Sequence, residues 1–484
     1  MNAIWLIALP LLGAFLLPII YRQHTKVGYW TGPFILILNL GIALRLWHDG
    51  QPHSIAMGGF SAPLGVLFYV DQLALLFVIL VVLGTLILWL GKERGRIQEE
   101  TLLLLIVAGG CGLALSGDLF NIYVFYEVVA VASYGLAASR GSGAGYAASI
   151  RFLILGALGS SLLLLGIALI YAVTGTLNLA HLAFLAPERL NGSVGLVAFA
   201  LMLIGFGVKA EIFPVNTWVP EVYATAPARI SALLGGVVSK LALVVVLRIL
   251  VLMYADTSAP LLLLSLGVLG VITGELAALR ATDLRQVLAY SSIGQLGLVA
   301  IAFAIPGAAG VIAGIALALH HAVVKPALFM LTEAWGGQLS RLVGAAQVSM
   351  LSTLLFLVLA LSLVGIPPLP GFWAKFLLLK GALATNIGWY QMAIAVVLIA
   401  TVIETAYFMR IVRLMFQQPT KKQGAEIPRI RDLAPALTLL VLLFVSVLTV
   451  GAIGKSLTAV AEEATDREAY INNTLPTNWL TLRQ

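Results

Sequence analysis

Residues 205–221, GFGVKAEIFPVNTWVPE, place a lysine and two prolines inside a hydrophobic stretch that is long enough to cross a bilayer. A second stretch of the same kind, VGIPPLPGFWAKF, covers residues 364–376. Proline removes a backbone hydrogen-bond donor and clashes with the preceding helical turn, so both stretches predict broken or kinked helices. Broken helices at corresponding places in two halves of a membrane protein point to a transport site. The two stretches therefore predict a transporter with an internal repeat.

The composition of the whole chain is typical of a protein that crosses a membrane many times. Of its 484 residues, 61% are hydrophobic and only 10% are charged, whereas soluble domains usually carry about 25% charged residues. Because a span needs about 20 apolar residues, we expect an all-α polytopic membrane protein with about 14 transmembrane helices. The expected spans are 3–20, 28–47, 70–91, 101–117, 119–138, 148–173, 194–218, 229–254, 259–280, 285–305, 309–334, 347–385 (broken), 388–415 and 434–453.

The basic residues predict the orientation in the membrane. The net charge is +7, and the cytoplasmic loops of membrane proteins carry an excess of lysine and arginine. Most of the 28 lysine and arginine residues lie on the inner side if both termini face outward. We therefore expect a multi-pass protein of a bacterial or archaeal inner (plasma) membrane, with both termini outside. The first segment lacks a cleavage site of the A-x-A kind, so we expect it to remain as a helix.

The spacing of the buried charges supports the internal repeat. Lys240 follows Lys209 by 31 residues (240 − 209), and Glu404 follows Lys375 by 29 residues (404 − 375). These pairs fall on the seventh and eighth spans and on the twelfth and thirteenth, so each repeat has five helices and the second copy is inverted. The alternative is chance, since proline is not rare in membrane helices. The expected regions are 1–100 (helices 1–3), 101–256 (first repeat), 257–416 (second repeat) and 417–484 (cytoplasmic loop, helix 14 and a short tail).

Four lysines lie inside expected spans, where a charge costs at least ~2.5–3.5 kcal/mol: Lys209, Lys240, Lys325 and Lys375. Burial favours the neutral form of a lysine, so such side chains can exchange protons near neutral pH. Glu127, in the fifth span, could pair with Lys209 and lower the cost of both charges. The alternative is that these residues serve only as structural counter-ions or hydrogen-bonding groups. Buried ionisable residues in a row usually move protons or ions.

A histidine and two more acids extend this set. His321 and Lys325 are four residues apart and share one helix face, so a proton could pass between them, whereas His320 points about 100° away. Glu404 could be the partner of Lys375 or an exit site, and Glu211 could tune the neighbouring Lys209 or bind a cation. Glu275 and Glu333 also fall within expected spans, and we expect Glu333 to reach the interface.

Several kinds of site are not expected. The single cysteine, Cys111, cannot form an internal disulfide, and the HHxxxK cluster at 320–325 has no carboxylate or thiol placed to complete a metal site. None of the glycine-rich segments has the GxxxxGK[ST] pattern of a phosphate-binding loop. We therefore expect no cofactor, no metal ion, no nucleic-acid partner and no catalytic centre in this chain. A redox cofactor would have to lie in another subunit.

Six ordered motifs resemble those of the antiporter-like subunits of complex I and its relatives. They lie along roughly residues 65–415 and read DLFNIYVFYE (118–127), LILGALGSSLLLLGIALIYAVTGTLNLA (153–180), GFGVKAEIFPVNTWVPEVYATAPARISALL (205–234), LAYSSIGQLG (288–297), HHAVVKPALFM (320–330) and GIPPLPGFWAKF (365–376). The DLFNIYVFYE and TGTLNLA forms are especially similar to the D subunit of Mrp-type multisubunit cation/proton antiporters. Membrane-bound hydrogenases carry similar subunits.

The resemblance implies a fold of 14 helices with two inverted five-helix repeats and broken helices 7 and 12. It also implies a polar, hydrated axis along the midplane of the membrane. The residues that match the family's charged positions on this axis are Glu127, Lys209, Lys240, His321, Lys325 and Lys375. This chain departs from the family's pattern at Glu211, Asn216 and Glu404.

These observations predict a proton-translocating, antiporter-like subunit of a multisubunit Mrp-type Na+(cation)/H+ antiporter. Its partners would be other membrane subunits, including sister antiporter-like subunits, and its substrates would be protons and sodium. The alternative is a proton-pumping membrane subunit of a redox-driven, complex I-like NADH dehydrogenase or membrane-bound hydrogenase. A third class, a bicarbonate-linked or purely structural subunit, is disfavoured because the ionisable residues are intact.

Overall fold

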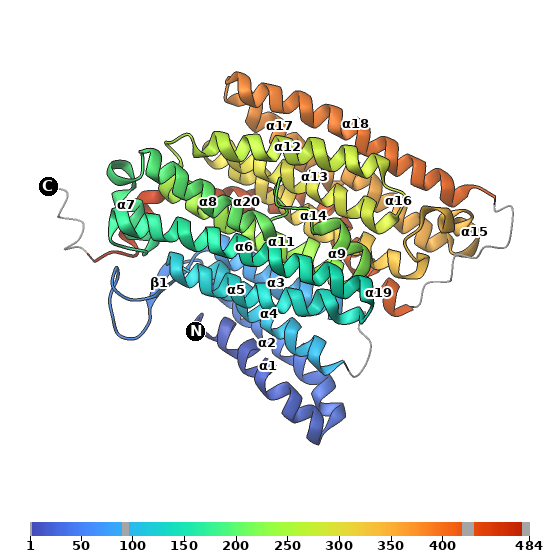
Figure 1. The fold of residues 1–484 in the computed structure, drawn as a ribbon, viewed down its shortest axis with the longest axis horizontal. Coiled ribbons are helices and arrows are strands. Elements are labelled where there is room, and N and C mark those ends of the chain that lie inside the picture. The colour runs from blue at the N-terminus through green and yellow to red at the C-terminus, as the bar shows by residue number, and fades with distance from the viewer. Residues whose placement is uncertain (1, 90–95, 419–429, 477–484) are drawn as a thin grey trace.

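The computed structural model describes residues 2–89, 96–418 and 430–476, with the side chains of 430–432 excepted. The chain folds into a bundle of helices with one small hairpin, β1 (His53–Ala56) and β2 (Leu67–Val70), which pair antiparallel (Figure 1). The helices up to residue 254 are α1 (Trp5–Gln23), α2 (Thr25–Asp49), α3 (Gln72–Trp89), α4 (Ile97–Leu115), α5 (Leu119–Ala137), η1 (Ala138–Arg140), α6 (Gly143–Thr174), α7 (Leu179–Arg189), α8 (Ser193–Lys209), α9 (Val219–Thr225), α10 (Ala228–Leu233), η2 (Leu234–Val238), α11 (Ser239–Ile249) and η3 (Leu250–Tyr254).

The remaining helices begin at residue 259. They are α12 (Ala259–Arg280), α13 (Leu284–Ala304), α14 (Ala308–Trp335), η4 (Leu339–Leu342), α15 (Ala345–Val348), α16 (Met350–Val364), α17 (Pro370–Ala384), α18 (Gly388–Phe416), α19 (Ile430–Leu448), α20 (Val450–Thr465) and α21 (Arg467–Asn472). Among the described residues, 11 helices are long and apolar enough to cross a membrane, or 12 if the bent pair α19–α20 is counted as one span. The protein is therefore a polytopic α-helical membrane protein.

The most buried helices lie in the middle of the bundle. Figure 1 shows α1 and α2 at one edge, α17 and α18 at the opposite edge, and α13 and α14 between them. In α13 and in the helix 228–254, 94% of the residues in the most apolar 18-residue segment are buried, whereas in α2 and α18 only 33% of the corresponding residues are buried. A helix that is apolar all round belongs inside a bundle or against lipid. The buried lysines at 240 and 325 lie on the central helices and not on the edge.

Both proline-containing stretches leave the helix where the sequence predicts a break. α8 ends at Lys209 and α9 begins at Val219, while residues 365–369 separate α16 from α17. As a result α8 and α16 are short apolar helices that do not reach the length of a full span. Backbone groups released at such breaks can solvate a charge where no water is available. A lysine lies next to each break, Lys209 at the end of α8 and Lys375 in the second turn of α17.

Two aspartates cap central helices in the same way. Asp118 accepts hydrogen bonds from the backbone N–H groups of residues 120 and 121 at the start of α5, and Asp283 accepts from those of 285 and 286 at the start of α13. Short polar caps of this kind satisfy the free donors at a helix start. Each aspartate also forms an isolated antiparallel bridge, Asp118 with Asn178 and Asp283 with Gln338. Asn178 precedes α7 and Gln338 precedes η4, next to α15, and α7 and α15 lie at opposite ends of the bundle (Figure 1).

The C-terminal part differs from the single span and polar tail expected there. The expected span 434–453 bends by 87° between Leu448 and Val450, so α20 runs nearly at a right angle to α19. α20 is amphipathic, because Leu457, Val460 and Ala461 are buried on one face while the opposite face is exposed. An average of hydropathy over all residues does not reveal a helix that is apolar on one face only, which is why the sequence predicted only a short tail after this span.

A buried ion pair lies where the C-terminal segment meets the rest of the bundle. Arg248 of α11 donates to both carboxylate oxygens of Asp71, just before α3, at 2.9 and 2.8 Å. The rings of Tyr69 and Tyr470 lie 5.9 and 5.7 Å from the guanidinium carbon. Glu463 of α20 accepts a hydrogen bond from the backbone N–H of Gln72 at 3.4 Å. These contacts attach α20 and α21 to the start of α3.

Part of the expected inner surface lies outside the described residues. This applies to most of the 417–432 loop, namely residues 419–429, and to the basic residues at 92 and 94. Of the acids near helix ends, Glu333 forms ion pairs with Arg140 at 3.0 Å and with Arg285 at 3.4 Å. It also accepts from the backbone N–H of Ala228. Glu333 therefore connects α5–α6, α10, α13 and α14 and does not simply extend to the interface.

Candidate functional site

The central helix α14 carries His321 and Lys325, and both side chains are fully buried. The ring Nδ1 of His321 lies within hydrogen-bonding distance of Lys240 Nζ on α11. Lys325 donates to the backbone carbonyl of Leu288 on α13 at 3.0 Å. The direct contact of His321 is therefore with Lys240, whereas the shared helix face suggested transfer between His321 and Lys325. His321 Nε2 has no hydrogen-bond partner among the described residues.

Lys240 is held by groups of its own helix as well as by His321. Its Nζ donates to the carbonyl oxygen of Gly235 and to Ser239 Oγ, the latter at 3.1 Å. Residues 234–238 form a π-helical turn, which shifts backbone carbonyls out of the regular helical pattern, and such turns are frequent at functional sites. Gly236 allows this turn to pack closely, because a Cβ there would lie 2.2 Å from Pro326 Cγ. A buried ammonium is thus solvated by carbonyl and hydroxyl oxygens.

Lys209 lies in an aromatic cage at the end of α8. Its Nζ is 4.6, 5.0 and 5.6 Å from the ring centres of Tyr126, Tyr134 and Phe152. It also donates to the Tyr134 hydroxyl at 3.4 Å. Aromatic faces attract a cation by about 0.5–2 kcal/mol, more when water is excluded. These aromatic neighbours of Lys209 were not predicted from the sequence, although Tyr126 directly precedes Glu127.

Glu127 does not contact Lys209 directly. Both residues are described by the structure and interact electrostatically, but they form no direct ion pair. Glu127 instead accepts a short hydrogen bond from Ser160 Oγ on α6, and it is only half-buried. The expected acid–lysine pair is therefore an interaction at longer range across the aromatic cage. Because the lysine has no direct counter-ion, either residue can change its charge without breaking a hydrogen bond between them.

Lys375 and Glu404 form the direct ion pair of the second half. Lys375 Nζ lies 2.7 Å from Glu404 Oε2 and donates to the carbonyl of Val364, just before the break, at 3.1 Å. Gln295 of α13 donates to the other oxygen of Glu404 at 2.8 Å. Lys375 is 8% and Glu404 is 1% exposed. The interpretation of Glu404 as the partner of Lys375 agrees with this geometry, and Gln295 is a further member that the sequence analysis missed.

Glu211 lies beside residues other than Lys209, the lysine it was expected to tune. It lies in the break after α8 with a left-handed backbone (φ 59°), and its Oε1 accepts from the Tyr223 hydroxyl at 2.6 Å. Its electrostatic neighbours are Lys240 and Lys325, and not the adjacent Lys209. Its Oε2 is buried without a hydrogen-bond partner in the described part of the chain. Glu211 is therefore an acidic neighbour of the central lysines.

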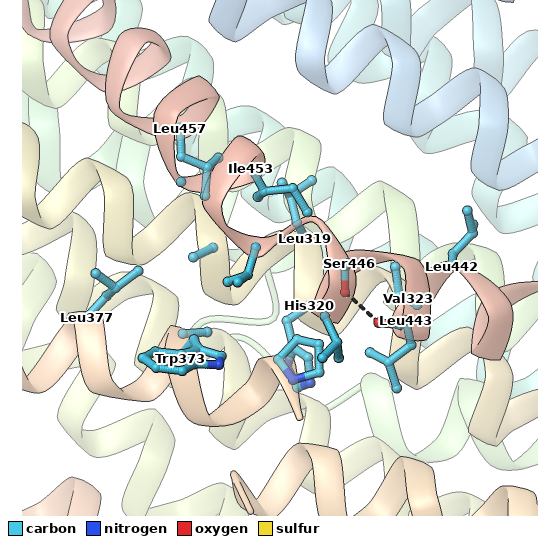
Figure 2. Close-up of a pocket in the computed structure, with 16 residues that line it drawn as sticks. Leu319, His320, Val323, Trp373, Leu377, Leu442, Leu443, Ser446, Ile453 and Leu457 are labelled. Atoms are coloured by element: carbon cyan, nitrogen blue, oxygen red, sulfur yellow. Dashed lines mark hydrogen bonds between the residues drawn. The ribbon is translucent and has the colours of Figure 1, made fainter. Parts of the chain in front are cut away.

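His320 points away from the row of charges. Its Nε2 contacts Ser362 Oγ on α16 at 2.9 Å. Figure 2 shows His320 beside Trp373 at an apolar cavity of about 170 Å³ in the angle between α19 and α20. As the helical geometry predicts, the two adjacent histidines face different surroundings. Within residues 2–89, 96–418 and 430–476, no group of three or more His, Cys, Asp or Glu side chains is placed to hold a metal ion.

The aromatic cage gives a test of how Lys209 is stabilised. Tyr134→Phe keeps the ring and removes only the 3.4 Å hydrogen bond, so we expect transport to fall less than about threefold. Tyr134→Leu removes the ring as well, and a cation–π loss of about 1–2 kcal/mol corresponds to about 5–30-fold. Ion transport by both variants, measured in membrane vesicles that contain the native complex, checks this. Equal losses in the two variants would contradict a role for the ring.

Comparison with known proteins identifies the family. Residues 116–404 match the family described as NADH:quinone oxidoreductase/Mrp antiporter, TM. The chain is 31% identical over 397 residues to the N subunit of NADH-quinone oxidoreductase of Desulforudis audaxviator, covering 78% of each chain. It is 32% identical over 399 residues to the D subunit of the Na(+)/H(+) antiporter of Bacillus subtilis, covering 78% of this chain and 80% of the relative.

Solved structures agree with this family assignment. A chain of the membrane-bound sulfane sulfur reductase, an archaeal respiratory membrane complex, superposes with a TM-score of 0.89 at 32% identity, covering 98% of this chain and 99% of that one. A chain of the Mrp complex from Dietzia sp. gives 0.87 at 27% identity, covering 97% and 98%. The resemblance deduced from the six motifs is thereby confirmed. This chain belongs to the NADH:quinone oxidoreductase/Mrp antiporter transmembrane family.

Proposed function

We propose that this chain is the proton-translocating, antiporter-like subunit of a multisubunit Mrp-type Na+(cation)/H+ antiporter. The observation that carries the proposal is a series of buried basic groups, Lys209 and Lys375 beside helix breaks, Lys240 beside a π-helical turn, and His321 and Lys325 on the central helix α14. Glu127 and Glu404 lie at the two ends of this series. A charge in the membrane interior is costly and is retained mainly for transport. The relative named as a Na(+)/H(+) antiporter component and the Mrp complex structure support the same reading.

The mechanism is electrostatic. A change in the charge of Glu127 alters the stability of the Lys209 ammonium, which faces aromatic rings and the Tyr134 hydroxyl. A proton released there moves toward Lys240, whose Nζ contacts His321. Because like charges disfavour protonation of their neighbours, the disturbance continues through Lys325 to the ion pair of Lys375. Glu211 limits the cost of two ammonium groups in the centre.

The arrangement in the membrane is part of this proposal. The protein would have 14 spans, with repeats at 101–256 and 257–416 flanked by 1–100 and 417–484, broken helices 7 and 12, and both termini outside an inner membrane. The matched aspartate caps support the inverted repeat. Leu119 N–H bonds to Leu177 O at 2.9 Å, as Leu284 N–H bonds to Gly337 O at 2.5 Å. The two caps lie at opposite ends of the bundle, as inversion requires.

The test is ion transport by vesicles that contain the native complex. Sodium-dependent dissipation of an imposed pH gradient is expected for the wild type and is expected to be lost in Lys209→Ala. Lys380→Ala, an exposed lysine on α17, is the matched control and is expected to transport normally. Wild-type transport in Lys209→Ala would contradict the role of Lys209.

A second candidate is a proton-pumping module of a redox-driven complex. The relative named as part of an NADH-quinone oxidoreductase and the fit to the archaeal respiratory complex favour it. It predicts no response to sodium and proton pumping on addition of a redox donor. The same vesicles therefore decide between the two candidates.

A further inference from the structure

A group of buried polar atoms lies between α12, α13 and α18, beside the Lys375–Glu404 pair. Glu275 of α12 is 3% exposed and Tyr407 of α18 is fully buried. Among the described residues, Glu275 Oε2, the Tyr407 hydroxyl and the Ser291 hydroxyl have no hydrogen bond of standard geometry. Buried polar groups are nearly always paired, so these three groups bond either to one another or to water.

Because α12 packs closely against α13, the carboxyl group of Glu275 points toward these buried polar atoms. A Cβ on Gly294 would lie 2.3 Å from Glu275 Oε1, so the carboxyl occupies space that only a glycine leaves open. Tyr407 faces Glu275, and Ser291 lies beside Tyr407. Glu404 and Tyr407 are three residues apart and share one face of α18. Glu275 consequently interacts electrostatically with Glu404 and Lys375.

A pocket reaches within about one helical turn of Glu275. It has a volume of about 570 Å³ at the adjoining ends of α12 and α13, and its lining includes Arg280, Thr282, Gln286 and Tyr290. Arg280 and Thr282 are exposed. The lining also includes Leu276, the residue next to Glu275, and Tyr290 is one turn from Gly294. The pocket and the buried carboxyl group therefore belong to the same part of α12 and α13.

We propose that Glu275 carries protons between this pocket and the Lys375–Glu404 pair. Glu275 and Glu404 interact with two lysines, Lys375 and Lys325, so whenever Lys375 is neutral the site has one excess negative charge, which a proton on Glu275 neutralises. In the transfer, an O–H bond of hydronium in the pocket breaks as an O–H bond forms on Glu275. That bond then breaks as an N–H bond forms on the neutral amine of Lys375, through the Tyr407 and Ser291 hydroxyls or water. The proposal rests on the proposed function, since it supplies the exchange route of Lys375.

The test uses the native complex in vesicles, with Glu275→Gln beside wild type, Lys209→Ala and the exposed control Glu188→Gln. Glutamine keeps the shape and the hydrogen-bonding capacity of the side chain and cannot carry a proton. We expect proton transport to fall about tenfold in Glu275→Gln. This is less than the ~10²–10⁴-fold contribution of a sole proton carrier, because water still enters the pocket. Glu275→Asp, which keeps an exchangeable proton, is expected to recover part of the rate.

The outcomes separate this proposal from the proposed function. Wild-type transport in Glu275→Gln with none in Lys209→Ala would overturn the role of Glu275 alone, and wild-type transport in both would overturn both. Glu275→Gln could instead change the sodium concentration that gives half-maximal transport and leave the maximal rate unchanged. That result would overturn the proton-carrying role and would indicate that Glu275 belongs to a cation site.

An infrared measurement on the wild type tests the proposal even if the Glu275 variants fold poorly. In wild-type vesicles, imposing a pH gradient is expected to change the protonated-carboxyl C=O band, and Tyr407→Phe is expected to shift that band. A band that does not respond in the wild type would overturn the proposal.

Discussion

Asp71→Ala is expected to lower the stability of the fold by about 3–5 kcal/mol, because it leaves the buried guanidinium of Arg248 without its partner. Asp71 accepts two hydrogen bonds from Arg248 at 2.8 and 2.9 Å, and Arg248 is 8% exposed. A lysine in this position could become neutral by releasing its proton. Arginine cannot, so the full cost of the unpaired charge remains. The midpoint of thermal aggregation in detergent, followed by size-exclusion chromatography, measures the loss.

Two further variants isolate the charge. Asp71 also accepts a hydrogen bond from the backbone N–H of Ala74 at 2.8 Å, which caps α3. Asp71→Asn keeps an acceptor for this cap and removes the charge, so it is expected to be nearly as destabilising as Asp71→Ala. The double variant Asp71→Ala/Arg248→Met removes both charges and is expected to recover most of the stability. A double variant as unstable as Asp71→Ala would show that the pair is not the source of the loss.

Lys375→Met is expected to lower proton transport by about 10²–10⁴-fold, the usual contribution of a positioned proton-transfer group. The fold is expected to survive, because Glu404 keeps its hydrogen bond from Gln295 and its electrostatic interaction with Lys325. Proton movement in vesicles and the yield of intact complex are the two measurements. Lys375 thus differs from Arg248, because its loss affects transport and leaves stability nearly unchanged.

The matched control for this variant is Lys380→Met on the same helix. Lys380 is exposed, so its replacement is expected to leave transport within about twofold of wild type, as for ordinary surface substitutions. A loss of complex in Lys375→Met that equals the loss of transport would assign Lys375 a structural role. Glu404→Gln, which keeps the bond to Gln295 and removes the charge, is expected to slow transport less than Lys375→Met.

Three features could be predicted from the sequence because each depends on local chemistry: the membrane character, the helix breaks and the family. The breaks at 210–218 and 365–369 follow from proline, which cannot continue the hydrogen-bond ladder. The helices begin near the expected positions because apolar composition decides what enters a bilayer. Lys209, Lys240, Lys325 and Lys375 stand out because a charge inside such a segment is costly.

The contacts between these residues could not be predicted, because they depend on tertiary packing. His321 contacts Lys240, 81 residues away, and not Lys325 on its own helix. Tyr134 and Phe152 come from α5 and α6 and surround Lys209 of α8. An average of hydropathy also hides α20, whose apolar residues occupy one face.

The packing of α20 against helices made much earlier has a consequence for the order of folding. α20 packs against α3 and α14, and Glu463 bonds to the start of α3 nearly four hundred residues earlier in the chain. Contacts of such long sequence separation form late, and chains of this length fold through intermediates as synthesis proceeds. The surface of α3 and α14 that receives α20 must therefore stay open until the last helices have been made. A nascent chain stalled before residue 450 would present that apolar surface to chaperones and proteases.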